Sequence, residues 1–92
     1  MKQSIEERTQ EDAISKLSSY ELYPFSVVFT YSGGVSDGLL SITFFSPQDI
    51  TRLLDILNYK SQCDKSGYFI VEEYNTIILS GIALLNFYTQ VP

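Results

Sequence analysis

Few residues in this chain could do chemistry, and their types exclude the commonest catalytic and metal sites. The sequence has no histidine and a single cysteine, Cys63. Without histidine the chain cannot form a Ser-His-Asp triad, a Cys-His pair or a histidine-rich zinc site. One cysteine cannot form a CxxC redox motif or a thiolate zinc site, so Cys63 is interpreted as a connector or packing thiol. We therefore predict no catalytic residue, no metal ligand and no cofactor.

The remaining polar motifs are equally uninformative about catalysis. Glu72 and Glu73 are adjacent, and neighbours on a predicted strand point to opposite faces, so they could not act together as acid and base. The glycine-rich segment 32–38 lacks the GK[ST] ending of a phosphate loop and precedes a predicted strand, so it is interpreted as a hairpin loop. The acidic N-terminal residues lack the pattern of a calcium loop.

Composition and charge indicate one folded domain over residues 1–92. Hydrophobic residues make up 45% of the chain and aromatic residues 14%, which is too apolar for disorder and favours a β-rich core. The net charge is −5, and the six basic residues are spread along the chain. Direct binding to nucleic acid or to anionic membranes is therefore disfavoured.

The same features predict a soluble, cytoplasmic protein. A single cysteine cannot form an intramolecular disulfide, which excludes a secreted disulfide scaffold. The polar N-terminus is unlike a signal peptide. The longest apolar stretch, 77–88, is 12 residues long and contains polar positions, whereas a membrane-spanning helix needs about 20 residues.

The N-terminal residues 1–22 read as a helical lead-in. Acidic residues early and a lysine late suit the helix dipole, and we expect a helix over 5–18. Its apolar stripe is thin and consists mainly of Ala13, Ile14 and Leu17. The lead-in is therefore expected to dock loosely.

The middle of the chain predicts a hairpin followed by a helix. Apolar residues alternate over 25–31 and again over 39–45, which is typical of half-buried strands close enough to pair. Ser46 followed by Pro47 is a helix start signal. Leucine and isoleucine at helical spacing then predict an amphipathic helix over 47–60.

The last third is less clear. A strand is expected over 68–74, whereas 77–88 fits either a strand with a bulge at Gly81 or a helix; the strand is preferred. Such a strand would be apolar on both faces, so it should lie centrally in a sheet or form an interface, a homodimer included. The fold class is then α+β, with α-β-β-α-β-β order and one antiparallel sheet of about four strands with helices packed on one face.

These inferences favour a small, acidic, non-catalytic protein-binding module. A stoichiometric inhibitor, an immunity-type protein and a viral antagonist all fit, and the acidic surface would steer a basic protein partner. One alternative is a small-molecule-binding or enzymatic domain that uses tyrosines and carboxylates in a pocket between sheet and helix. The other is an acidic homodimeric secretion chaperone, since class I type III secretion chaperones are also small and acidic, with a broadly similar element order, although they are usually longer; this is an analogy of fold.

The predicted contact residues are chosen for expected exposure. They comprise the outward face of the helix over 47–60, the tip of the hairpin loop and the end of the strand over 68–74. The residues are Asp37, Arg52, Asp55, Tyr59, Glu72 and Tyr74.

Overall fold

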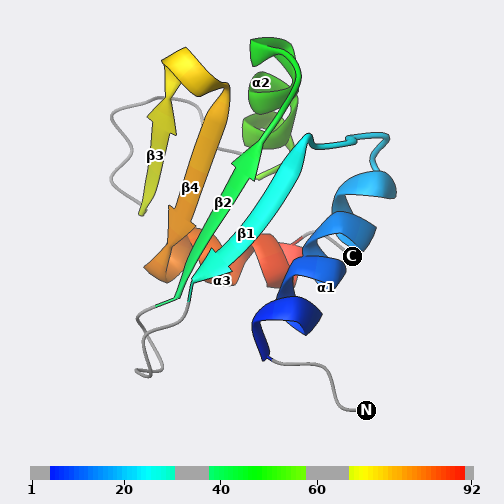
Figure 1. Cartoon of the computed structure of the whole chain (residues 1–92), viewed down its shortest axis with the longest axis vertical. Coiled ribbons are helices and arrows are strands. Elements are labelled where there is room, and N and C mark those ends of the chain that lie inside the picture. Colours follow the sequence, from blue (N-terminus) through cyan, green and yellow to red (C-terminus); the bar gives the residue numbers. More distant parts are fainter. Residues whose placement is uncertain (1–4, 31–37, 58–66, 91–92) are drawn as a thin grey trace.

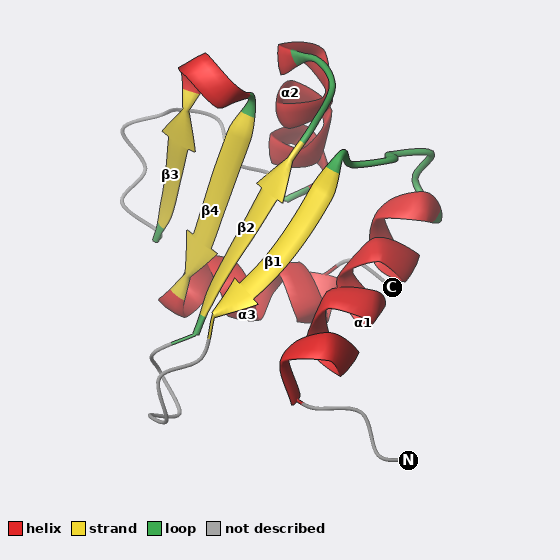
Figure 2. Cartoon of the chain, in the orientation of Figure 1, coloured by secondary structure: helices red, strands yellow, loops and turns green. Residues whose placement is uncertain are grey.

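Residues 5–30, 38–57 and 67–90, which the computed structural model describes, form one four-stranded antiparallel sheet and three α-helices (Figures 1 and 2). The elements in chain order are α1 (Ile5–Ser18), β1 (Ser26–Thr30), β2 (Leu39–Thr43), α2 (Pro47–Ile56), β3 (Tyr68–Val71), a 3₁₀ turn η1 (Glu72–Tyr74), β4 (Thr76–Ser80) and α3 (Gly81–Gln90). The predicted α+β fold and α-β-β-α-β-β order are confirmed, and α3 follows them.

The sheet has the strand order β1-β2-β4-β3, and all neighbouring strands are antiparallel. The predicted hairpin is therefore formed by β1 and β2. The strand β4 lies between β2 and β3, so both of its edges are paired. This central position is one of the two expected for the apolar segment that begins at Ile77.

The cross-strand register lines up apolar side chains on one face of the sheet. One row consists of Val27, Ile42, Ile77 and Ile70, and the next consists of Phe29, Leu40, Leu79 and Tyr68. Directly opposed side chains of this kind are the unit of sheet stabilisation. The two rows form the surface on which the helices pack.

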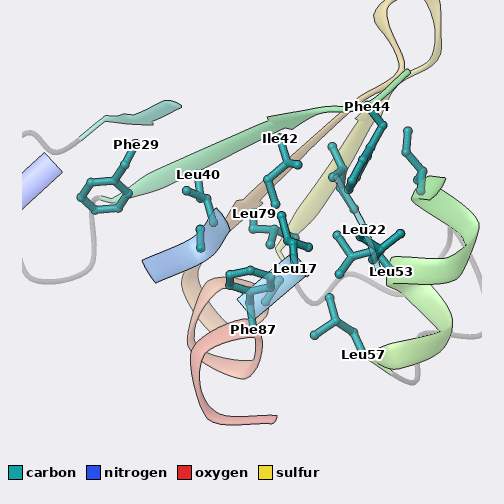
Figure 3. Packing of buried hydrophobic residues seen from close by; sticks show 14 residues of the cluster. Leu17, Leu22, Phe29, Leu40, Ile42, Phe44, Leu53, Leu57, Leu79 and Phe87 are labelled. Atoms are coloured by element: carbon teal, nitrogen blue, oxygen red, sulfur yellow. The ribbon is translucent and has the colours of Figure 1, made fainter. Parts of the chain in front are cut away.

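All three helices contribute to the core on this face (Figure 3). The helical residues of the buried cluster are Ala13, Leu17, Ile50, Leu53, Ala83 and Phe87. No polar or charged side chain is buried in the described part of the chain. Apolar burial, worth about 25 cal/mol per Å², is therefore what joins the helix layer to the sheet, and the prediction of helices on one face is confirmed.

The helix predicted over 5–18 has those bounds in the structure. Ala13 and Leu17 are fully buried as expected, but the prediction that Ile14 packs beside them is wrong, because its side chain is 46% exposed. Leu22, beyond the helix, is fully buried. Contact with the sheet also includes a hydrogen bond from the Phe29 N–H to Oε1 of Gln10, 2.9 Å long, which places α1 along the outer edge of β1.

Helix α2 begins where the sequence predicts, but the Ser46 side chain does not cap it in the expected way. Ser46 is the extended N-cap residue and Pro47 follows it as the first helical residue. The Ser46 hydroxyl does not bind a backbone N–H; it lies 3.5 Å from the Asp49 carboxylate. The described helix ends at Ile56, and positions 58–60 of the predicted span lie outside the described residues.

The strand predicted over 68–74 is too long. β3 ends at Val71, Glu72 opens the 3₁₀ turn, and Asn75 ends that turn in the left-handed region at φ 49°. The prediction that Glu72 and Glu73 point to opposite faces of a strand is therefore wrong. Both carboxylates are exposed at the end of the sheet.

The preference for a strand over 77–88 is wrong beyond Ser80. The chain turns at Gly81, where φ is +52°, and continues as α3. A strand would have placed Ala83, Leu85 and Phe87 on one face. In the helix, Ala83 and Phe87 lie four residues apart on the buried face, whereas Leu85 is 62% exposed. Gly81 therefore begins a helix and is not a bulge.

Substitution of Gly81 tests this turn. A Cβ at Gly81 would meet no atom within 4 Å, so any effect of Gly81→Ala arises from the left-handed backbone. We expect Gly81→Ala to lower the free energy of unfolding in urea by about 1–2 kcal/mol. Gly81→Asn should lower it less, because asparagine tolerates this conformation. Equal stability of the wild type and Gly81→Ala would contradict a left-handed Gly81.

Candidate functional site

None of the described helices covers the second face of the sheet (Figure 1). A row of side chains crosses all four strands on this side and consists of Val28, Ser41, Ile78 and Phe69. Val28 is 50% exposed and Phe69 is 64% exposed. A sheet with one bare face normally alternates apolar residues inside with polar residues outside, so these apolar side chains are unusual there.

We call this surface the open face. By strand alternation it consists of Ser26, Val28, Thr30, Leu39, Ser41, Thr43, Phe69, Val71, Thr76, Ile78 and Ser80. None of these residues is charged, although the chain carries a net charge of −5. The charged residues of the described helices and turns lie outside it. Depletion of charge is what distinguishes the centre of a protein interface from ordinary surface.

Several hydroxyl groups of the open face are already hydrogen-bonded within the protein. The hydroxyls of Thr43 and Thr76 lie 2.8 Å apart across the register. Thr76 also donates to the carbonyl of Tyr74 (3.1 Å), and Ser80 donates to the carbonyl of Gly67 (3.0 Å). A polar group with an internal partner loses less when water is removed. The open face can therefore be dehydrated at a modest cost.

Two exposed phenylalanines lie at the end of the sheet nearest α2 (Figure 1). Phe25 directly precedes β1, and Phe45 follows β2. Their rings form an edge-to-face pair with centroids 5.5 Å apart, and both are largely exposed. Contiguous exposed apolar patches mark interaction sites on soluble proteins.

The sequence reasoning missed this surface, although a signal for it existed. The strand alternation had already separated the outer set of each strand from the inner set. Reading all four predicted strands together would have shown an outer set whose only charged member is Glu73, at the end of the strand predicted over 68–74. The pairing of β3 with β4, which brings Phe69 beside Ile78, is not visible in the sequence.

The structure does not bring the four described residues of the predicted contact set together on one surface. Asp37 and Tyr59 lie outside the described residues. Arg52 and Asp55 are exposed on α2 as expected, but the Arg52 guanidinium donates to the carbonyl of Tyr20 (3.0 Å). Arg52 thus ties α2 to the connection that follows α1.

The other two predicted residues lie at the η1 turn. Tyr74 is 67% exposed. Glu72 lines a groove of about 350 Å³ between α2 and the end of β3, where Thr51 and Leu54 are among its neighbours. Arg52 and Asp55 are not among the residues that line this groove, so Glu72 meets α2 on a different side of that helix.

A pocket of about 390 Å³ lies where α1, β1 and α3 meet. Its lining is mostly apolar and consists of Thr9, Asp12, Phe29, Gly38, Gly81, Leu84, Leu85 and Tyr88. The Tyr88 hydroxyl donates to the carbonyl of Thr9 (2.9 Å), and the Lys16 ammonium lies 5.9 Å from the centre of the Tyr88 ring. Burial, and to a lesser extent the carboxylate of Asp12, raise the pKa of Tyr88 from 10.0 to about 12.

Within the described residues, no group of three or more histidine, cysteine, aspartate or glutamate side chains could hold a metal ion. Over the same residues, no helix has the length and apolarity needed to cross a membrane. No protein-family model, curated protein or solved structure matches this chain. Function must therefore be argued from the surfaces themselves.

The raised pKa of Tyr88 predicts a pH dependence of stability. The unfolded chain gives up this proton near pH 10, whereas the folded chain holds it until about pH 12. The stabilisation is therefore complete below pH 10 and is lost as the pH rises toward 12. We expect urea unfolding to show a steeper loss of stability over this range for the wild type than for Tyr88→Phe. Tyr74→Phe, which alters an exposed phenol, is the matched control; equal slopes for the wild type and Tyr88→Phe would contradict the coupling.

Proposed function

We propose that this protein is a small, acidic, non-catalytic protein-binding module that acts stoichiometrically through the open face. The observation that supports this most is the combination of bare apolar side chains and absent charge on one side of an acidic chain. A surface of this kind is costly to leave in water. It gains free energy when another apolar surface covers it.

The shape and charge of the open face favour a protein as the ligand. A small molecule binds best in a concave site that buries most of its surface, whereas the open face is one side of a sheet. Nucleic acids require clustered lysine and arginine, and the open face has neither. The partner would supply an apolar surface that matches the sheet.

Acidic groups next to the open face would attract a basic partner. Glu72 and Glu73 are exposed just beyond the end of β3, and the net charge of −5 would accelerate encounter with a positively charged protein. Inhibitors, immunity-type proteins, viral antagonists and secretion chaperones are classes in which such a module would act. A cytoplasmic location belongs to the same proposal.

Capture of partners from a lysate of the source cells tests the function. The tagged wild type is compared with Phe69→Thr, which removes a ring from the open face but retains a residue suited to strands. Tyr74→Thr is the matched control, because Tyr74 is as exposed as Phe69 but lies in η1. We expect Phe69→Thr to reduce the amount of bound protein at least about fivefold and Tyr74→Thr to leave it unchanged.

The reverse pattern would contradict the assignment of the surface. Loss of binding in Tyr74→Thr alone would favour the contact set that includes Glu72 and Tyr74. Equal recovery by all three proteins would remove the open face as the binding site.

The pocket at Tyr88 supports a second candidate, a small-molecule-binding domain. Its apolar walls and the single carboxylate of Asp12 suit an aromatic amine, with the ring against Phe29 and the ammonium group near Asp12. Saturation-transfer NMR should then detect phenethylamine binding more strongly than phenethyl alcohol. Asp12→Asn should weaken amine binding by roughly two- to fivefold, as for an exposed ion pair. Equal signals for the amine and the alcohol would exclude a role for Asp12.

A further inference from the structure

We infer that the partner that covers the open face is a second copy of this chain, packed against it face to face about a twofold axis. The inference rests on the proposed role of the open face as a protein-binding surface and names its occupant; a basic protein would then meet the exposed carboxylates that lie outside this face. Three properties of the described residues support it: the distribution of charge, the size of the face and the order of side chains across it.

The charge distribution favours self-association through the open face over association through α1. Two copies with a net charge of −5 each repel one another, and burying a carboxylate without a partner is costly. Association through α1 would bring the exposed Asp12 toward another copy. The open face brings no charged group. It is therefore a surface through which two identical acidic chains can meet without burying a charge.

The open face is large enough for a dimer. Five-residue strands extend about 17 Å, and three spacings between four strands add about 14 Å of width. This outline covers about 240 Å², and the projecting side chains, with the ring of Phe45 at one end, raise the exposed area to the order of 500–600 Å² per copy. Standard interfaces bury about 800 Å² on each partner, and weakly associating ones bury less. Two sheets that pack face to face about 10 Å apart form the core of an ordinary β-sandwich.

The order of side chains across the sheet is self-complementary. The row reads Val28, Ser41, Ile78 and Phe69 from β1 to β3, so two smaller side chains precede two larger ones. A twofold axis that runs along the strands between β2 and β4 places Ser41 over Ile78 of the second copy. It likewise places Val28 over Phe69 of the second copy. Small residues then face large ones across the interface, which is the arrangement that packs without voids.

Such a dimer would leave the helix layers of both copies on the outside. Arg52 and Asp55 of α2 would remain exposed on each side. The assembly would therefore present two identical helical surfaces to any further protein.

Sedimentation velocity of the purified protein over a range of concentrations tests the inference. We expect a monomer–dimer equilibrium whose dissociation constant falls or stays constant as sodium chloride is raised, because salt screens the repulsion between the two acidic copies. Val28→Glu should raise the dissociation constant at least about tenfold by placing a carboxylate on the face. Ile14→Glu adds the same charge at a similarly exposed position on α1 and should raise it much less.

An exchange of side chains tests the proposed register. Val28→Phe and Phe69→Val should each weaken the dimer, by overpacking and by a void respectively. The double variant again pairs a small residue with a large one, so its dissociation constant should return to within about threefold of the wild type. Additive weakening in the double variant would overturn the register.

A wild-type protein that remains monomeric at every concentration would overturn the dimer. If a monomeric wild type captured some other protein from the lysate and Phe69→Thr failed to capture it, the open face would keep its proposed function, with that protein as its occupant. If Phe69→Thr captured the same proteins as the wild type, the proposed function would fall as well. Sedimentation velocity therefore tests the dimer, and capture from the lysate tests the proposed function of the open face.

Discussion

The packing of the central strand β4 is the contact on which the rest of the structure depends. Ile77 and Leu79 are fully buried beneath the helix layer, and the backbone of β4 pairs with both β2 and β3. Removing β4 from the sheet would leave β3 without a neighbouring strand and would divide both apolar rows. The described core contains no buried polar group, so this apolar contact has no ion pair or polar network to replace it.

The one-sided architecture follows from that constraint. All three helices attach to the same apolar rows, and α1 also shields the outer edge of β1 through Gln10. Covering that edge protects it from unwanted strand pairing. No described helix covers the other face, and the hydroxyls of Thr43, Thr76 and Ser80 on it form hydrogen bonds within the protein. Several polar groups on the open face thus have hydrogen-bond partners within the protein, and the face carries no charged residue.

Charge and apolar surface are separated in this fold. Every described strand residue is uncharged, whereas α1, α2 and η1 carry exposed carboxylates. Long-range attraction of a basic protein and close apolar packing would therefore act at different places on the surface. This separation is compatible with a homodimer that meets through the sheets and presents its charged helices outward. The pocket at Tyr88 lies in the helix layer and would stay open in such an assembly.

The sequence by itself determined the α+β class, the helix over 5–18, the hairpin and the start of α2, because each is encoded by local periodicity or a cap signal. Tertiary structure decided the rest. The end of the strand at Ser80 depends on Gly81 adopting positive φ, and alternation and helical spacing are equally compatible with the residues that follow. The open face exists only because β3 pairs with β4 and all the described helices pack on the opposite side of the sheet. Strand order and the choice of face are long-range properties, so the residues of one strand do not reveal what lies beside it.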